Sequence, residues 1–217
     1  MEVLYNFFRK TIEQAGGVIY IVGPMEDYKN FQNFVDGIII PGGRDLHPKF
    51  YGEEVKGSKL EEDVEDRYLY TKNIYENVIK EIPIFGICWG FQFLNVLKGG
   101  TLVQHLKNSD DHYKKRRYFF KKGSWFHSVI GHEAIGNCYH HQGLGRIGKD
   151  IEIVAIDDNC KEPHALEVHE PSRFVVAVLW HPEATFTDET GEQYDELNQQ
   201  LFAAFVDKCN EYKNSKH

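Results

Sequence analysis

The segment from Ile82 to Gln92 constrains this chain more than any other part of it. An apolar run ends in Gly86-Ile-Cys88, and Trp-Gly90 with a second apolar run follows. The pattern predicts a buried strand, a tight turn at the cysteine and a helix behind it. At that turn the thiol lies at a helix N-terminus, where the partial positive charge favours a thiolate. The segment therefore predicts a nucleophilic cysteine on a strand-to-helix elbow, the position that holds a serine in unrelated hydrolases.

The rest of the chain alternates apolar strands with amphipathic helices. We expect strands at 18–22, 37–40, 84–87, 152–156, 165–168 and 174–180, and helices at 3–12, 28–34, 68–81, 91–97 and 192–211. A polar stretch rich in His and Lys runs to about residue 136, and no element is predicted in it. Continuous apolar strands between helices predict an α/β fold with a doubly wound, mostly parallel sheet and helices on both faces. No internal repeat or linker divides the chain, so we expect one domain over residues 1–217.

Composition limits the classes of function. The chain has 217 residues, of which 41% are hydrophobic, so it can bury one sizeable core. A net charge of −8 argues against a nucleic-acid-binding protein, and the basic cluster at 114–117 is expected to be solvated. No apolar run reaches the roughly 18 residues of a membrane span, and we expect neither a signal peptide nor a membrane partner. Four cysteines without regular spacing predict reduced thiols and a cytoplasmic location.

A cysteine nucleophile needs a base, and the base needs a group that orients it. The sequence offers both in His181-Pro-Glu183, directly after the strand predicted to end at Trp180. Residues two apart in an extended segment point the same way, so His181 and Glu183 can face one site. We therefore predict Cys88, His181 and Glu183 as a catalytic set.

The transition state of acyl transfer needs hydrogen-bond donors for a developing oxyanion. Two sources are natural: the backbone N–H of Trp89, which opens the elbow helix, and an N–H of the glycine turn at Gly42 and Gly43. All these segments follow strands of the predicted parallel sheet, and ligands bind beyond the carboxyl ends of such strands. We therefore expect the turn and the elbow to converge on one site.

Five motifs together resemble those of a known superfamily. They are Pro41-Gly-Gly-Arg-Asp45-x-x-Pro48-x-x-Tyr51-Gly-Glu53, Gly86-Ile-Cys88-x-Gly-x-Gln92, Gly99-Gly-Thr-Leu-x-Gln104, Asn137-x-x-His140-His-Gln142 and Trp180-His-Pro-Glu183. The chain resembles the class I glutamine amidotransferase superfamily and, within it, the γ-glutamyl-γ-aminobutyrate hydrolase branch. The first and fourth motifs favour the hydrolase branch over the ammonia-donating subunits.

The resemblance implies a fold and a chemistry. The fold is the flavodoxin-like one of the amidotransferases, and the activity is hydrolysis of a γ-glutamyl amide through a γ-glutamyl thioester on Cys88. His181 is implied as general base and then acid, and Glu183 as its orienter. Gln92, His140 and Gln142 match positions that line the substrate pocket. No cofactor is implied.

The chain departs from the hydrolase pattern in several places. Trp89 stands where the branch has Arg, Leu179 where it has Gln, and Cys138 where it has Ser, while Tyr68 follows Arg67 in place of Asp. The family also opens with a strand before the first helix, and this sequence begins in the helix, so the N-terminal strand is expected to be missing. We expect a homo-oligomer or a larger assembly to complete that sheet edge.

Other interpretations stay open at this stage. One is a glutaminase that passes ammonia to a synthase partner, and another is a non-catalytic structural subunit that has kept its triad by descent. His140 and His141, with other histidines, suggest a zinc site, but no pair shows a tight ligand spacing with a carboxylate or cysteine partner. We therefore predict no metal, and Cys138 and Cys160 as packing residues.

Overall fold

The computed structural model describes residues 2–23, 26–60, 64–107, 115–184 and 195–216. The predicted features at 61–63, 114 and 192–194 lie outside these residues. The elements are α1 (Glu2–Gln14), α2 (Tyr28–Phe31), β1 (Ile38–Ile40), the 3-10 helix η1 (Pro48–Tyr51), α3 (Val64–Asn77), β2 (Ile84–Ile87), α4 (Trp89–Leu97), β3 (Leu102–Val103), β4 (Arg116–Phe120), α5 (Trp125–Ile130), β5 (Glu133–Gly136), β6 (Gly143–Leu144), β7 (Ile151–Asp157), β8 (Pro163–His169), β9 (Phe174–Val178) and α6 (Asp195–Ser215).

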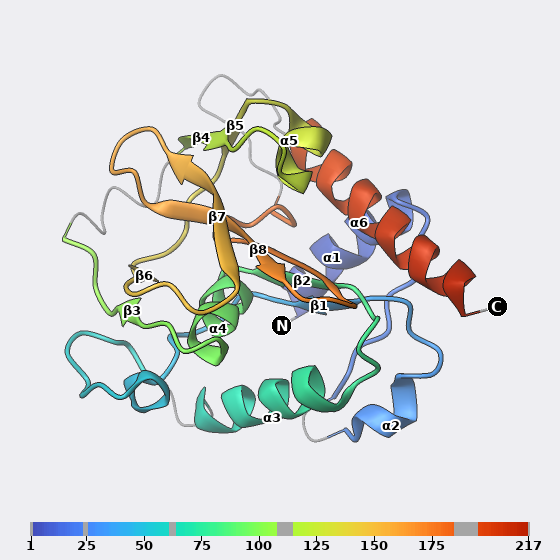
Figure 1. Ribbon diagram of the computed structural model, residues 1–217, viewed down its shortest axis with the longest axis horizontal. Helices are drawn as coiled ribbons and strands as arrows, with labels where there is room; N and C mark the ends of the chain where they lie inside the picture. The colour runs from blue at the N-terminus through green and yellow to red at the C-terminus, as the bar shows by residue number, and fades with distance from the viewer. Residues whose placement is uncertain (1, 24–25, 61–63, 108–114, 185–194, 217) are drawn as a thin grey trace.

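A mixed seven-stranded sheet runs through the molecule in the order β1-β2-β9-β8-β7-β4-β5 (Figure 1). β1, β2 and β9 are parallel, and every other pairing in this sheet is antiparallel. The expected parallel pairing is therefore found in β1, β2 and β9, the strands next to the elbow. The other strands differ because short connections join β7 to β8 and β8 to β9, and such connections return the chain antiparallel.

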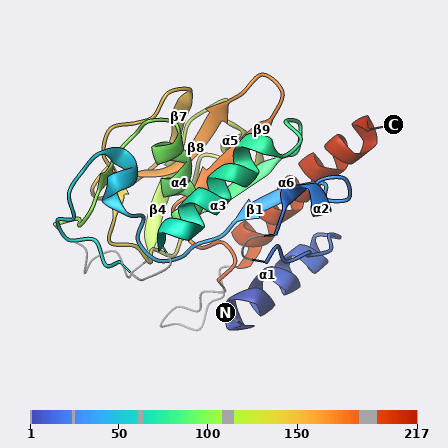
Figure 2. The ribbon, with the colours of Figure 1, turned by 90° about the horizontal axis from the view of Figure 1, so that it is seen from below.

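Helices cover both faces of the sheet, as predicted (Figure 2). Side chains of β2 alternate: Phe85 and Ile87 pack with α1, α5 and α6, while Ile84 packs with α3 and α4. β9 alternates in the same way, with Val176 on the first face and Val175 on the second. These central strands are apolar on both faces because both faces are buried.

The residues at 18–22 correct the sequence prediction, because they form no strand. Val18 and Ile21 are exposed, at 94% and 59%, while Ile19 and Val22 are partly buried against the core. β1 is hydrogen-bonded only to β2, and no other described strand lies along its free side. Without a neighbouring backbone on which to form a ladder, an apolar run of this length stays irregular.

The polar stretch is more ordered than the sequence indicated. It contains β4, α5 and β5, and β4 pairs with β5 and β7 to extend the sheet. The other predicted strands and helices are found within a few residues of their expected positions. Among the described helices, none has the length and apolar character needed to cross a membrane.

Candidate active site

Cys88 occupies the predicted elbow between β2 and α4. Its backbone lies at φ 50° and ψ −97°, a strained conformation for a residue with a side chain. The N–H of Cys88 donates to the Val178 carbonyl (2.8 Å), which holds the turn at the end of β9. A Cβ at Gly86 would come within 2.9 Å of the Gly90 backbone, and one at Gly90 would overlap the Ile40 carbonyl oxygen. The flanking glycines are thus required by the close approach of three backbone segments.

His181 and Glu183 follow β9 and meet each other as the sequence predicted. His181 Nδ1 lies 2.6 Å from Glu183 Oε1, and the Glu183 side chain is fully buried. Burial disfavours the charged imidazolium, but hydrogen bonds with Cys88 and Glu183 outweigh it and raise the pKa of His181 to about 10. The imidazole therefore keeps its proton at neutral pH and lies within hydrogen-bonding reach of the Cys88 sulfur.

Asn137 fixes the backbone of the histidine. The His181 N–H donates to Asn137 Oδ1 (2.8 Å), and Asn137 Nδ2 donates to the His181 carbonyl (2.7 Å). The Tyr118 hydroxyl in turn donates to the Asn137 carbonyl (2.7 Å). Asn137 belongs to a motif visible in the sequence, but no sequence signal showed that its amide holds the peptide of a residue 44 positions away.

The glycine turn after β1 lies against both reacting side chains. A Cβ on Gly42 would lie 2.6 Å from His181 Cε1 and 3.4 Å from Cys88 Cβ. Arg67 on α3 braces this turn: its Nη2 donates to the carbonyls of Pro41 (2.7 Å) and Gly42 (3.1 Å). Arg67 binds the carbonyl oxygens of the turn. The N–H groups of the turn are therefore the candidates for an oxyanion hole.

Comparison with known proteins places this geometry in a family. The model of the family described as Peptidase C26 matches residues 1–183. The chain belongs to the Peptidase C26 family.

Individual relatives support the predicted superfamily. A Rickettsia prowazekii protein called "Putative glutamine amidotransferase-like protein" is 26% identical over 94% of this chain and 88% of its own. The γ-glutamyl-γ-aminobutyrate hydrolase of Escherichia coli O157:H7 is 25% identical over 81% of this chain and 72% of its own. A crystal structure from Thermoplasma acidophilum, described as a "putative gmp synthase subunit a protein", matches with TM-score 0.74 over 98% of this chain and 91% of its own, at 16% identity. The resemblance to glutamine amidotransferases is confirmed, and this Peptidase C26 member is a hydrolase of that type.

Trp89, the departure next to the nucleophile, is a core residue in this Peptidase C26 chain. Its side chain is 1% exposed and stacks on Phe93, with ring centroids 5.2 Å apart. The Arg67 guanidinium lies over the Trp89 ring, 4.0 Å from its centroid. Leu179 is fully buried in the same apolar cluster. These departures therefore alter packing behind the elbow, and the Trp89 N–H, as the first of α4, has no acceptor within the helix.

The three residues predicted to bind substrate are Gln92, His140 and Gln142, and the first and last of them are in contact with each other. Gln92 follows Cys88 by one helical turn, and its Nε2 donates to the Gln142 carbonyl (3.3 Å). The Gln142 amide donates to Ser58 Oγ (3.1 Å) and to the Gln104 carbonyl (3.3 Å). His140 is buried and directed toward other side chains, described below. Binding of substrate by these three residues stays a prediction.

One residue near the base was missed by the sequence analysis. The Tyr139 ring lies 6.2 Å from the His181 ring, centroid to centroid, and is 42% exposed. Tyr139 stands at an unspecified position of the Asn137-to-Gln142 motif, so the sequence did not single it out. It lies there because the segment 137–142 runs beside the end of β9.

Proposed function

We propose that the chain hydrolyses the γ-glutamyl amide bond of a small γ-glutamyl compound through a thioester on Cys88. The observation that carries the proposal is the set at the elbow: a strained cysteine, hydrogen-bonded to a histidine that is held by a buried carboxylate. This set has the parts that thiol-dependent acyl transfer requires.

In the first step Cys88 Sγ attacks the γ-carbonyl carbon. The carbonyl electron pair moves onto oxygen, where the N–H of Trp89 and an N–H of Gly42 or Gly43 stabilise the charge. The C–N bond then breaks as His181 gives its proton to the leaving nitrogen. The products are a free amine and a γ-glutamyl thioester.

In the second step His181 takes a proton from water, and the oxygen attacks the thioester carbonyl. The C–S bond breaks, and the γ-carboxylic acid product leaves and gives its proton to solvent. Sγ departs as the thiolate beside the imidazolium, so the starting pair is restored. Glu183 accepts the Nδ1–H of His181 in both steps and so keeps the imidazole oriented, as the acidic residue of a triad does.

The γ-glutamyl part of the proposal rests on the named Escherichia coli hydrolase and on polar residues close to the elbow. Gln92 and Gln142 supply the amide groups that we assign to the amino-acid end of the substrate. The four cysteines are all free thiols, and we propose a cytoplasmic location on that basis.

Trapping with a γ-glutamyl-directed electrophile tests the proposal. We expect rapid covalent labelling of Cys88 in the wild type, no labelling of Cys88→Ala at that site, and slow labelling of Cys160 and Cys209. Peptide mass spectrometry locates the adduct. If Cys88 reacts no faster than Cys160 or Cys209, the assignment of the nucleophile is wrong.

A second candidate function has support from the edge strand β1. Val18, Tyr20 and Ile21 are exposed, and β1 pairs on one side only among the described strands. We propose that a partner subunit or a second copy covers this edge, as in a glutaminase that supplies ammonia to a synthase or a subunit retained for assembly. Glutamine hydrolysis that rises when a partner is added identifies the first of these, and full activity of the isolated chain excludes both.

A further inference from the structure

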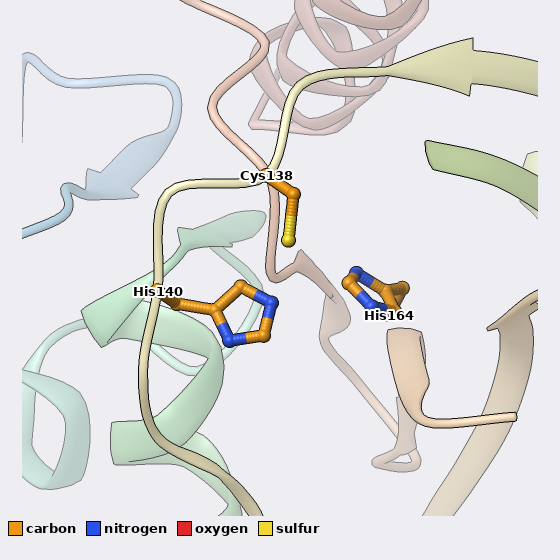
Figure 3. A group of neighbouring side chains, drawn as sticks. All are labelled: Cys138, His140 and His164. Atoms are coloured by element: carbon orange, nitrogen blue, oxygen red, sulfur yellow. The ribbon is translucent and has the colours of Figure 1, made fainter. Parts of the chain in front are cut away.

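Three side chains with metal-binding atoms converge away from the elbow. Cys138 and His140 lie on the segment between β5 and β6, and His164 lies on β8. The sulfur and one nitrogen from each ring lie within 4.8 Å of one another, and Figure 3 shows all three directed toward a common point. Their exposed fractions are 0% for Cys138, 4% for His140 and 0% for His164. We call this set the loop site.

The hydrogen bond of His140 fixes which nitrogen faces the loop site. Its Nδ1 lies 3.0 Å from the Gln142 carbonyl oxygen, which can only accept, so Nδ1 carries the proton. In the neutral ring Nε2 then bears a lone pair, as a metal ligand must. Metal-binding histidines characteristically donate their other N–H to a backbone carbonyl or carboxylate.

Charged side chains around the loop site suit a cation held by a thiolate. His164 Nε2 lies 3.8 Å from the buried carboxylate of Asp157. Asp157 is held in place by the N–H and the Sγ of Cys160, each 2.8 Å from a carboxylate oxygen. Glu162 adds a second acidic group and Arg116 a basic one, and both act on the Cys138 thiol. Around the loop site, two acidic side chains therefore stand against one basic side chain.

We propose that Cys138, His140 and His164 form a binding site for one Zn²⁺ ion. A thiolate with two imidazoles is a donor set that zinc prefers, whereas Mg²⁺ and Ca²⁺ prefer oxygen. In a tetrahedral zinc site the ligand atoms lie about 3.4 to 3.6 Å apart, so binding requires them to draw together by roughly 1 Å. The ion forms a bond to Sγ and displaces the thiol proton to solvent, and no electron is transferred.

The site has a structural consequence for the elbow. Cys138 follows Asn137, whose amide holds the His181 peptide, and His140 precedes the segment against which Gln92 packs. A metal joining this segment to β8 fixes the backbone that positions the histidine. The inference does not depend on the proposed hydrolysis, because its readout is the metal itself.

Cobalt spectroscopy on the full chain tests the site. Co²⁺ titrated into metal-free protein is expected to bind once per chain, with tetrahedral visible bands and a thiolate-to-cobalt charge-transfer band, and Zn²⁺ is expected to displace it. The titration is made in the Cys88→Ala variant, because Cys88 and His181 are a second thiol–imidazole pair that could also bind Co²⁺. Cys209→Ser is the matched control for loss of a distant thiol.

In that background, Cys138→Ser and His164→Gln are each expected to weaken binding by more than about 100-fold, since even residues that only support a ligand cost 10- to 100-fold. Circular dichroism checks that the variants fold. Two results overturn the proposal: unchanged affinity in a folded Cys138→Ser variant, or no thiolate-to-cobalt band in the Cys88→Ala protein itself. The second needs no substitution in the loop site, so it holds even if those variants fail to fold.

Discussion

The molecule holds two buried cysteines beside histidines, and the groups behind the histidines differ. At the elbow, a buried carboxylate backs His181, with Glu183 Oε1 2.6 Å from Nδ1. At the loop site, a backbone carbonyl backs His140, with the Gln142 oxygen 3.0 Å from Nδ1. A carboxylate stabilises the imidazolium, whereas a carbonyl only fixes the tautomer of a neutral ring.

The surroundings of the two thiols differ as well. Burial raises the pKa of Cys138 to about 12, and this thiol lies in an irregular segment that does not begin a helix. Cys88 directly precedes α4 as its N-cap residue and faces an imidazole whose pKa is raised to about 10. A cysteine–histidine contact alone therefore does not define a nucleophile. The group behind the imidazole and the backbone under the thiol decide between proton transfer and metal binding.

Removing the carboxylate is the most direct way to break this difference. Glu183→Gln keeps the shape of the side chain and removes a negative charge that, together with Cys88, helps to raise the pKa of His181. We expect γ-glutamyl hydrolysis to fall roughly 10²- to 10⁴-fold, the range for loss of positioned acid–base catalysis. Steady-state kinetics measure the effect, and the conservative Glu183→Asp variant should recover part of the rate. An unchanged rate in Glu183→Gln would contradict the role of the carboxylate.

The pH dependence of alkylation sharpens the comparison between the thiols. The pKa of His181 rises from 6.5 to about 10 on folding, so the imidazolium is charged at neutral pH and loses its proton only as the pH approaches 10. Iodoacetamide should therefore modify Cys88 even near pH 6, below the pKa of about 8.5 of a free thiol.

The other three thiols provide the contrast within the same sample. Burial, as the largest cause, raises the pKa of Cys138, Cys160 and Cys209 each to about 12. We expect Cys88 to react at least about 100-fold faster than any of them near pH 7. Peptide mass spectrometry measures all four rates, and His181→Gln is expected to abolish the reactivity near pH 6. Equal rates for Cys88 and Cys160 would remove the distinction.

A smaller effect is expected from the backbone beneath the elbow. In Gly90→Ala the added methyl group overlaps the Ile40 carbonyl oxygen, so β1 and α4 must separate. We expect a loss of about 1 to 3 kcal/mol in the free energy of unfolding, as for other overpacked sites, together with lower activity. Gly23→Ala is the matched control, because no atom lies within 4 Å of its added Cβ. Urea denaturation compares the two, and equal stability would show that the elbow tolerates the extra atom.

The central strands and the elbow were predictable because their signals are local. Ile84–Ile87 is a continuous apolar run between turn residues, and the glycines around Cys88 mark a turn without reference to any distant segment. His181 and Glu183 were predictable as a pair because residues two apart in an extended segment face the same side. The strand expected at 18–22 was wrong because a strand exists only if a neighbour offers backbone partners, and the apolar pattern does not report that.

The sequence by itself determined the α/β class, the elbow and the three residues gathered at it, since each follows from short-range periodicity or spacing. Only the tertiary structure decided that Arg67 braces the glycine turn, that Asn137 holds the His181 peptide, and that His164 joins Cys138 and His140. His164 comes from β8, 24 residues beyond His140 in the sequence. The reason is physical: hydrogen bonds and ligand geometry depend on distances in space, and pairing of β7 with β8 and of β8 with β9 sets those distances.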